Sequence, residues 1–440
     1  MSDLTVIGGG LAGSEAAWQA ARAGLSVTLF EMRPVRSTEA HQTDGLAELV
    51  CSNSLKTDQP DTPAGQLKAE LRALDSLILQ AADAARVPAG SALAVDRERF
   101  SRAVTEAIEH HPNIRVVREE VTELPKPPAI IATGPLTAPA LSEALKGATG
   151  ETDLYFYDAI SPIVAADSVN MSVAFRASRW DRGEDAEGDY LNCPMTDGEY
   201  HAFVAALLAA RTVEAASFEE KAIYFEGCMP IEVIAARGPE TLAHGPMKPV
   251  GLTDPRTGRW PYAAVQLRQE DLGRNYYNLV GFQTKLAYPE QERVFRMIPG
   301  LEDAEFFRLG AVHRNTYVNA PRCLGPGLML KERPGVWLAG QVTGVEGYLE
   351  STAMGMVAGR NAARHLHGEG PLSPPESSAI GALLRYLSHG DPERYQPMNV
   401  NFGLFPPPAV RARKRADRRR AVIERAREEF AAWRSSFPQP

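Results

Sequence analysis

Residues 4–31 decide the fold of this chain, and their sequence is LTVIGGGLAGSEAAWQAARAGLSVTLFE. The apolar start predicts a strand, the alanine-rich part after the glycines predicts a helix, and the apolar end predicts a second strand. Gly8, Gly10 and Gly13 match the pattern G-x-G-x-x-G between the first strand and the helix. Glycines at these places allow a tight turn, close approach of the backbone to a pyrophosphate, and close packing of helix on sheet. The stretch therefore predicts a unit that holds the phosphates of a dinucleotide at a helix N-terminus.

An acidic residue at the end of the second strand indicates which dinucleotide is bound. Glu31 follows Gly13 by eighteen residues, where a carboxylate accepts a hydrogen bond from a ribose 2′-hydroxyl and repels a 2′-phosphate. We therefore expect the adenosine of FAD or NAD rather than that of NADP. The alternative is a glycine-rich turn that binds nothing. The expected cofactor-binding residues of this unit are Gly8, Gly9, Gly10, Leu11, Ala12, Gly13 and Glu31.

Length and composition limit the class of protein. The chain has 440 residues, of which 44% are hydrophobic, and this suits two or three packed cores and a large buried cofactor. It begins without a basic segment leading into an apolar one, and no apolar run approaches the roughly eighteen residues that a membrane span requires. We expect a cytoplasmic protein with no membrane partner, whose oligomeric state the sequence leaves open.

The four cysteines stand far apart. Cys51, Cys193, Cys228 and Cys323 form no C-x-x-C pair, which argues against a disulfide framework, a metal site and a paired redox motif. Free cysteines are mostly small buried hydrophobic residues, and we interpret Cys193 and Cys323 in this way. Cys51 has polar neighbours, which favours exposure, and Cys228 lies two residues before a proline, which favours a turn. Any thiol chemistry would therefore use single cysteines.

Later segments divide the chain into parts. The apolar run at 129–134 ends in Ala-Thr-Gly and is similar to the second fingerprint of flavoproteins with two dinucleotide folds. Residues 151–330 change to short apolar runs with many prolines, glycines and aromatic clusters, which predicts an inserted mixed α/β substrate domain. The strand that ends at Gly340 and Gln341 indicates that the first fold resumes, although this segment could be purely structural.

The predicted fold class is therefore α/β. A discontinuous Rossmann-type FAD-binding domain, resembling that of glutathione reductase, is expected from residues 1–150 and 331–375, with a C-terminal extension at 376–440. Apolar spacing further predicts helices at 66–85, 96–110, 197–210, 351–365, 380–387 and 411–433, and a strand at 219–225.

The last of these helices is strongly basic. Residues 411–427 contain nine Lys or Arg but only two acidic residues, on a chain whose net charge is −8. Such a run is often a solvated helix face. Its segregation on an acidic protein favours contact with a nucleic-acid backbone.

Several motifs together resemble the TrmFO family. They are VIGGGLAGSEAA at 6–17, LVCSNS at 49–54, EGCMPIE at 226–232, NLVGFQT at 278–284, HRNTY at 313–317, GQVTGVEGY at 340–348 and NFGL at 401–404. The two cysteine motifs are the most specific. The resemblance implies a folate- and FAD-dependent methyltransferase that forms 5-methyluridine at position 54 of the tRNA T-loop. It also implies 5,10-methylenetetrahydrofolate and NAD(P)H as co-substrates.

The same resemblance implies roles for single residues. Uracil C5 is a poor nucleophile until a thiolate adds to C6, and this nucleophile is assigned to Cys228. Cys51 would be a second thiol near the flavin, which assists proton removal or protects a reactive flavin state. The folate pterin would be stacked and held by His313 and Arg314, and the uracil or flavin would be positioned by Tyr348. From the residues alone, His313 could be a core histidine and Tyr348 a packing residue.

The remaining roles concern the flavin and the RNA. By similarity to FAD proteins of this class in general, Gly340 and Gln341 would cover the flavin side of the cofactor, although those proteins usually have aspartate at the position of Gln341. The target uridine must be exposed or flipped from the folded T-loop. The tRNA would contact the cleft near Cys228 and, through its phosphates, the basic C-terminal helix.

Three other functions stay open at this point. The chain could modify the wobble uridine or ribosomal RNA as a related flavoenzyme. It could be a pyridine-nucleotide disulfide oxidoreductase, although such an enzyme would show a paired cysteine motif and a second Rossmann unit. It could also be a noncatalytic flavin-bearing RNA-binding protein.

Overall fold

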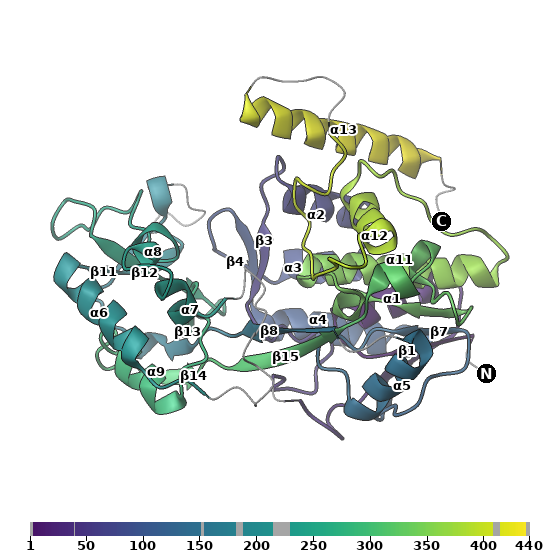
Figure 1. The fold of residues 1–440 in the computed structure, drawn as a ribbon, viewed down its shortest axis with the longest axis horizontal. Helices are drawn as coiled ribbons and strands as arrows, with labels where there is room; N and C mark the ends of the chain where they lie inside the picture. The colour runs from purple at the N-terminus through teal and green to yellow at the C-terminus, as the bar shows by residue number, and fades with distance from the viewer. Residues whose placement is uncertain are drawn as a thin grey trace.

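The protein has two lobes joined by a two-stranded ribbon (Figure 1). The computed structural model describes residues 3–38, 40–150, 154–181, 188–213, 229–407 and 414–436. The ribbon consists of β8 (Leu154–Ala159) and β15 (Val312–Tyr317), which pair antiparallel. The chain leaves the larger lobe through β8 and returns through β15, so the smaller lobe is an insertion into the larger one.

A parallel sheet forms the centre of the larger lobe. Its strand order is β16-β7-β1-β2-β6, with β1 (Leu4–Ile7), β2 (Val27–Glu31), β6 (Ile114–Arg118), β7 (Ala129–Ile131) and β16 (Val336–Leu338). All four strand pairs are parallel. Parallel strands need covered faces, and β1, β7 and β16 are almost entirely buried. The sheet confirms the α/β class, and β16 confirms that a late segment returns to the first fold.

Two long helices pack closely on one another beside this sheet. They are α1 (Leu11–Arg22) and α11 (Tyr348–Leu366). A Cβ on Gly355 would lie 2.1 Å from the carbonyl oxygen of Ala12, and one on Gly359 would lie 2.3 Å from that of Ala16. Only glycine permits this approach, so α11 is fixed in position against α1. Both helices consequently begin at the same cleft.

The rest of the larger lobe surrounds these elements. Its helices are α2 (Pro63–Ala73), α3 (Leu77–Ala84), α4 (Arg97–Glu109), α5 (Pro139–Thr149), α10 (Ala320–Cys323) and α12 (Ala379–His389). A small sheet consists of β3 (Ser54–Thr57), β5 (Ala92–Val95) and β4 (Arg86–Val87).

The prediction of one helix at 66–85 is wrong. The structure has two helices, α2 and α3, separated at Asp75, whose φ is +58°. Ser76 caps α3, because its hydroxyl accepts a hydrogen bond from Leu79 N at 3.3 Å. Because both helices bury apolar residues, the apolar spacing continues across the break. Periodicity alone therefore does not reveal the turn at Asp75.

The smaller lobe is an antiparallel sheet covered by helices. The strand order is β10-β11-β12-β13-β9-β14. The strands are β9 (Ile163–Ala165), β10 (Phe175–Ala177), β11 (Tyr190–Met195), β12 (Ala263–Gln269), β13 (Tyr276–Leu279) and β14 (Phe306–Arg308). The helices are α6 (Asp197–Ala209), α7 (Ile231–Ala235), α8 (Thr241–His244) and α9 (Tyr288–Phe295). Its separate core includes Tyr200, Phe203, Phe282 and Phe295.

The C-terminal helix α13 (Arg415–Ser435) lies on the outside of the larger lobe, next to α2. Its N-terminal end points toward the side of the smaller lobe in the view of Figure 1. One face of α13 is apolar, because four of its own residues are buried: Val422, Ile423, Ala426 and Phe430. Other short helices are η1 (Ala166–Ser168), η2 (Arg179–Asp181), η4 (Pro326–Leu328) and η5 (Gly340–Thr343).

Two further points bear on the sequence predictions. The strand expected at 219–225 lies outside the described residues, and the domain boundaries at 150, 330 and 375 stay a prediction. In the part of the chain that the structure describes, no helix has the length and apolar character needed to cross a bilayer.

Candidate active site

The glycine turn connects β1 to α1 and forms one wall of a cleft. Gly8 has a φ of +99°, which strongly favours glycine. A Cβ on Gly13 would lie 1.7 Å from the carbonyl oxygen of Gly8, so no other residue fits there. Gly10, at the N-terminal end of α1, has open space where a Cβ would be. The turn thus fits a pyrophosphate close to the backbone and at the N-terminus of α1.

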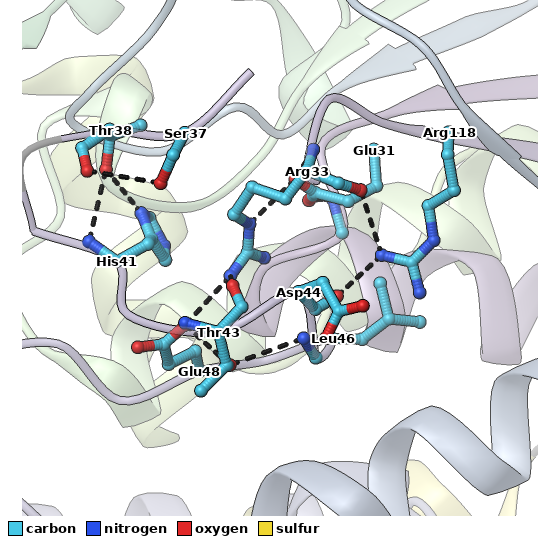
Figure 2. A network of polar contacts seen from close by, with 12 residues as sticks. Glu31, Arg33, Ser37, Thr38, His41, Thr43, Asp44, Leu46, Glu48 and Arg118 are labelled. Atoms are coloured by element: carbon cyan, nitrogen blue, oxygen red, sulfur yellow. Dashed lines mark hydrogen bonds and ion pairs between the residues drawn. The ribbon is translucent and has the colours of Figure 1, made fainter. Parts of the chain in front are cut away.

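Glu31 lines the same cleft and belongs to a network of polar contacts (Figure 2). Its Oε2 accepts a hydrogen bond from Gly9 N at 2.8 Å, and its Oε1 accepts from Arg33 Nε at 2.9 Å. Arg33 also pairs with Glu48 at 3.0 Å. Burial favours a higher pKa for Glu31, but the hydrogen bonds and charge of Arg33 outweigh it and lower the pKa.

This arrangement bears on cofactor choice. Arg33, only 2% exposed, is held between two carboxylates. Arg33 is thus neutralised and is a poor partner for a 2′-phosphate. Arg118, which lies opposite Glu31 on β6, pairs with Glu109 at 3.0 Å and donates to the carbonyl oxygens of Arg33 and Asp44. The ionised carboxylate of Glu31 lines the cleft and fits a ribose hydroxyl.

The opposite end of the cleft is formed by the late segment. Gly340 has a φ of +79°, and a Cβ there would lie 2.7 Å from that of Ala12. The Gln341 amide donates to Glu346 at 2.6 Å, and Gln341 lines the cleft. The first turn of α11 contributes Tyr348 and Ser351 to the same wall. Other lining residues include Leu11, Ala12, Val50, Thr133 and Gly134.

Cys51 lies in a loop attached to this end of the cleft. The Tyr348 hydroxyl oxygen accepts hydrogen bonds from Cys51 N at 2.9 Å and from Ser52 N at 3.1 Å. The cysteine is half-buried. Tyr348, which lines the cleft, therefore also fixes the backbone of Cys51. Burial, followed by the nearby Cys51, raises the pKa of Tyr348 far above its usual value, so the phenol stays protonated.

The same loop is fastened to the smaller lobe. Asn53 is fully buried, and its amide nitrogen donates to Gln269 O at 2.8 Å while its oxygen accepts from Arg268 Nε at 2.8 Å. Ser52 Oγ accepts from Arg268 Nη2 at 2.7 Å. The polar motif Ser-Asn-Ser thus connects the two lobes.

Three charged residues that the sequence analysis did not select lie behind this loop. Arg97 donates to Leu49 O and to the Glu270 carboxylate, and Arg308 donates to Val50 O at 3.1 Å. Arg97 comes from α4 and Arg308 from β14, and Glu270 is the residue that follows β12. No local pattern marks them, because they are far apart in sequence and single charged residues are common.

The chain that forms this cleft is similar to known proteins over almost its whole length. The family model described as "GIDA: Glucose inhibited division protein A" matches residues 3–370. The methylenetetrahydrofolate–tRNA-(uracil-5-)-methyltransferase TrmFO of Anaeromyxobacter dehalogenans is 57% identical over 443 residues, covering 99% of this chain and 98% of its own. The enzyme of that name from Moorella thermoacetica is 58% identical over 438 residues, covering 99% of each chain.

The chain belongs to the TrmFO family. This confirms the resemblance seen in the sequence motifs. Aquifex aeolicus GidA has the same fold, with a TM-score of 0.71 over 98% of this chain and 73% of that chain, at 18% identity. The TrmFO family and the GidA fold together confirm a Rossmann-type flavoprotein architecture.

Three site residues that the family resemblance implies are not fully covered by the described part of the structure. Cys228 lies outside the described residues, and so do the side chains of His313 and Arg314. Only the backbone of β15 is placed, with His313 opposite Asp158 and Arg314 opposite Tyr157. The end of β15 reaches η5, because Val318 N donates to Val342 O at 2.9 Å. The roles of Cys228, His313 and Arg314 therefore stay predictions.

The other two cysteines have the structural character expected of them. Cys193 is fully buried in the core of the smaller lobe, and burial raises the pKa of its thiol to about 12. Cys323 is buried and its thiol donates to Asn319 O at 3.2 Å. Among the described residues, no group of three or more His, Cys, Asp or Glu is arranged to hold a metal ion.

Proposed function

We propose that this protein transfers a one-carbon unit from 5,10-methylenetetrahydrofolate to C5 of uridine 54 in the T-loop of tRNA, with FAD as cofactor and NAD(P)H as reductant. The near full-length identity to enzymes named for this transfer supports the reaction. The observation that carries the proposal is the Cys51 loop, which the Tyr348 hydroxyl fastens to the wall of a dinucleotide cleft.

The residues that line the cleft suit the parts of FAD. Glu31 would hold the adenosine ribose, residues 8–13 the pyrophosphate, and Gln341 with the first turn of α11 the flavin end. When bound, the flavin supplies the electrons that reduce the transferred methylene group to a methyl group. The described residues then have to orient the substrates and keep water away from them.

The thiols would activate the uracil. A thiolate that adds to C6 makes C5 nucleophilic, and the family resemblance assigns this step to Cys228. C5 must lose its proton after the new carbon–carbon bond forms, and we assign this proton to Cys51. Tyr348 acts on Cys51 indirectly, because it holds the cysteine backbone by two hydrogen bonds.

Helix α13 would bind the RNA backbone with only part of its positive charge. Arg425 donates to the carbonyl of Pro407 at 3.0 Å, and Arg419 lies 4.8 Å from the ring centre of Phe402. These two side chains hold the helix on the protein. Arg415, Arg418 and Arg420 are exposed at its N-terminal end, where phosphate contacts can orient RNA without reading its sequence.

The test is transfer of labelled carbon from methylenetetrahydrofolate to an unmodified tRNA transcript. We expect Cys51→Ala and Cys228→Ala each to reduce transfer at least 100-fold while FAD stays bound, since removal of a group that acts on protons or as nucleophile has effects of this size. Cys193→Ala and Cys323→Ala are matched controls and should keep most activity. Undiminished transfer in Cys51→Ala would remove that thiol from the mechanism.

The position in the RNA is tested with the same assay. A transcript in which uridine 54 is replaced by cytidine should accept no label. Label that persists on this transcript, or that appears only with wobble-position uridine, would contradict the T-loop assignment. A purified protein that never takes up FAD would contradict the flavin-dependent reaction as a whole.

A further inference from the structure

Three side chains meet beside Cys51 and form the cluster Arg97–Glu270–Arg308. Arg97 begins α4 in the larger lobe, whereas Glu270 and Arg308 come from the smaller lobe. Arg97 and Glu270 form an ion pair, and each arginine donates one nitrogen to a carbonyl of the Cys51 loop. The cluster therefore lies where the two lobes and the thiol loop meet.

The cluster contains polar atoms with no hydrogen-bond partner among the described residues. These atoms are Arg97 Nη2, Arg308 Nε, Arg308 Nη2 and Glu270 Oε1, and all four are buried. Glu270 is only 5% exposed. A buried donor or acceptor without a partner is costly. Anchoring the loop requires one nitrogen of each arginine, so anchoring alone does not account for the others.

Three other buried carboxylates differ from Glu270, whereas Glu350 also has one buried oxygen, Oε2, without a hydrogen-bond partner among the described residues. Both oxygens of Glu15, Glu31 and Glu70 have hydrogen-bond partners. In these cases the carboxylate is a completed structural element. Glu270 instead has an oxygen without a partner in the same cluster as guanidinium nitrogens without partners, and such a partly satisfied polar network is costly.

The charges in the cluster are also unbalanced. Burial, and after it the neighbouring Arg97, lowers the pKa of Arg308, although the charges of Glu270, Cys51 and Tyr348 oppose this. Two guanidinium groups thus share one carboxylate. A ligand that brings an electron-rich oxygen would relieve their mutual repulsion.

We propose that this cluster recognises the lactam edge of a substrate ring, with Glu270 Oε1 accepting its N–H and an arginine nitrogen donating to its carbonyl oxygen. The free atoms supply an acceptor beside donors, and a lactam edge presents a donor beside an acceptor. The position next to Cys51 places that ring at the thiol. This proposal rests on the proposed function, which supplies two rings with such an edge.

The two sources are the target uracil and the folate pterin. Both present N3–H beside a carbonyl oxygen at C4. For the uracil, guanidinium donors at O4 would also stabilise the negative charge that develops when a thiolate adds to C6. For the pterin, the same contact would only orient the ring. Substrate atoms can therefore distinguish the two sources.

The uracil source is tested by removing the two partners of one hydrogen bond in turn. We expect Glu270→Gln to lower kcat/KM for the tRNA transcript at least 30-fold with FAD content unchanged. A transcript with 3-methyluridine at position 54 should lose a similar factor with the wild type. If the uracil is the ligand, combining variant and modified transcript should cost less than threefold beyond either change alone.

The pterin source is tested without RNA. The dissociation constant of tetrahydrofolate is measured from changes in flavin absorbance of the FAD-loaded protein. If the pterin is the ligand, Glu270→Gln should raise this dissociation constant at least tenfold. The factor by which 3-methyluridine at position 54 lowers kcat/KM should then be the same in Glu270→Gln as in the wild type. Arg308→Lys, which keeps a charge and a donor for the Val50 carbonyl, is a second variant in case Glu270→Gln folds poorly.

A matched control is Arg296→Gln, because Arg296 is an arginine of the same lobe that also donates to a backbone carbonyl, that of Ala304. It should leave both assays unchanged. The proposal is overturned if Glu270→Gln and Arg308→Lys both keep kcat/KM and the dissociation constant of tetrahydrofolate within threefold of wild type. It is also overturned if neither the uracil nor the pterin test gives its expected result, or if both variants lose FAD. Failure of the wild type to methylate uridine 54 would instead contradict the proposed function, while the tetrahydrofolate measurement would still test the cluster.

Discussion

The glycine turn and the Cys51 loop form parts of one cleft, but they are built differently. The turn is made from backbone within residues 8–13, and its shape follows from which positions carry no side chain. The Cys51 loop is held by Arg97, Arg308 and Tyr348, which come from distant parts of the chain. A site made of local backbone can be recognised from the residue pattern alone, whereas Cys51 and Tyr348 are named only through the family resemblance and Arg97 and Arg308 are not named at all.

The largest effect is expected from a methyl group in the turn. In Gly13→Ala the new Cβ would lie 1.7 Å from the Gly8 carbonyl oxygen, so the turn must open or the helix must move. We expect loss of FAD and destabilisation by about 3 kcal/mol or more, as for other severe steric conflicts. Flavin absorbance of the purified protein and thermal unfolding measure the two effects.

Matched glycines show whether the contact or the residue type matters. Gly147→Ala, in α5 with open space around its Cβ, should bind FAD normally. Gly10→Ala also has open space in the protein, so it should fold normally and yet bind FAD more weakly, because the methyl would face the pyrophosphate. Normal FAD content in Gly13→Ala would mean that the turn does not determine cofactor binding.

The same contrast explains what the sequence could predict. The strand–turn–helix at 4–31, the α4 helix and the return strand at Val336–Leu338 were predicted, because each has a local apolar period or a glycine signal. The break at Asp75 was missed, since the apolar spacing continues across it. Arg97, Glu270 and Arg308 were also missed, because a charged residue acquires its role only when β12, β14 and α4 come together.

Tyr348→Phe tests the side-chain half of the comparison. It removes the oxygen that accepts two backbone N–H groups, so Cys51 and Ser52 lose a buried partner each. We expect methyl transfer to fall 10- to 100-fold with FAD retained, because small displacements of reacting groups have effects of roughly this size. Stability should change by only about 1–3 kcal/mol.

The control for Tyr348→Phe is Tyr386→Phe. The hydroxyl of Tyr386 donates to the Gln396 carbonyl oxygen at 2.6 Å, and Tyr386 does not line the cleft. It should leave transfer unchanged. Because burial raises the pKa of Tyr348 far above its usual value, the wild-type pH profile below pH 10 should contain no step from this phenol. Equal activity of Tyr348→Phe and wild type would show that the loop needs no such fastening.

Glu70 is a buried carboxylate of purely structural character, in contrast to Glu270. It accepts hydrogen bonds from Ala379 N and Ile380 N at the start of α12, and burial raises its pKa to about 7. The folded protein keeps this proton up to about pH 7, whereas the unfolded chain releases it near 4.5. Stability should therefore fall as pH rises between these values, by at most about 3 kcal/mol.

Glu70→Gln removes this titration and should flatten the dependence of the melting temperature between pH 5 and pH 7. Methyl transfer by the variant should stay close to wild type at pH 6, since Glu70 lies at the α2–α12 contact and does not line the cleft. An unchanged pH slope would contradict the role given to this carboxyl. A large loss of activity would contradict the distinction from Glu270.

The smallest effect on activity is expected from α13. Two of its arginines differ in whether their side chains are already bound to the protein. Arg425 is committed to a backbone carbonyl of its own chain, whereas Arg418 is exposed and free for a phosphate. Arg418→Gln should weaken tRNA binding about two- to fivefold and reduce the salt dependence by about one released counterion. Arg425→Gln should instead lower the melting temperature and keep the slope of log Kd against log salt concentration. If both variants changed that slope equally, the charge of α13 would act as a whole, and its side-chain contacts would not select which arginines meet the RNA.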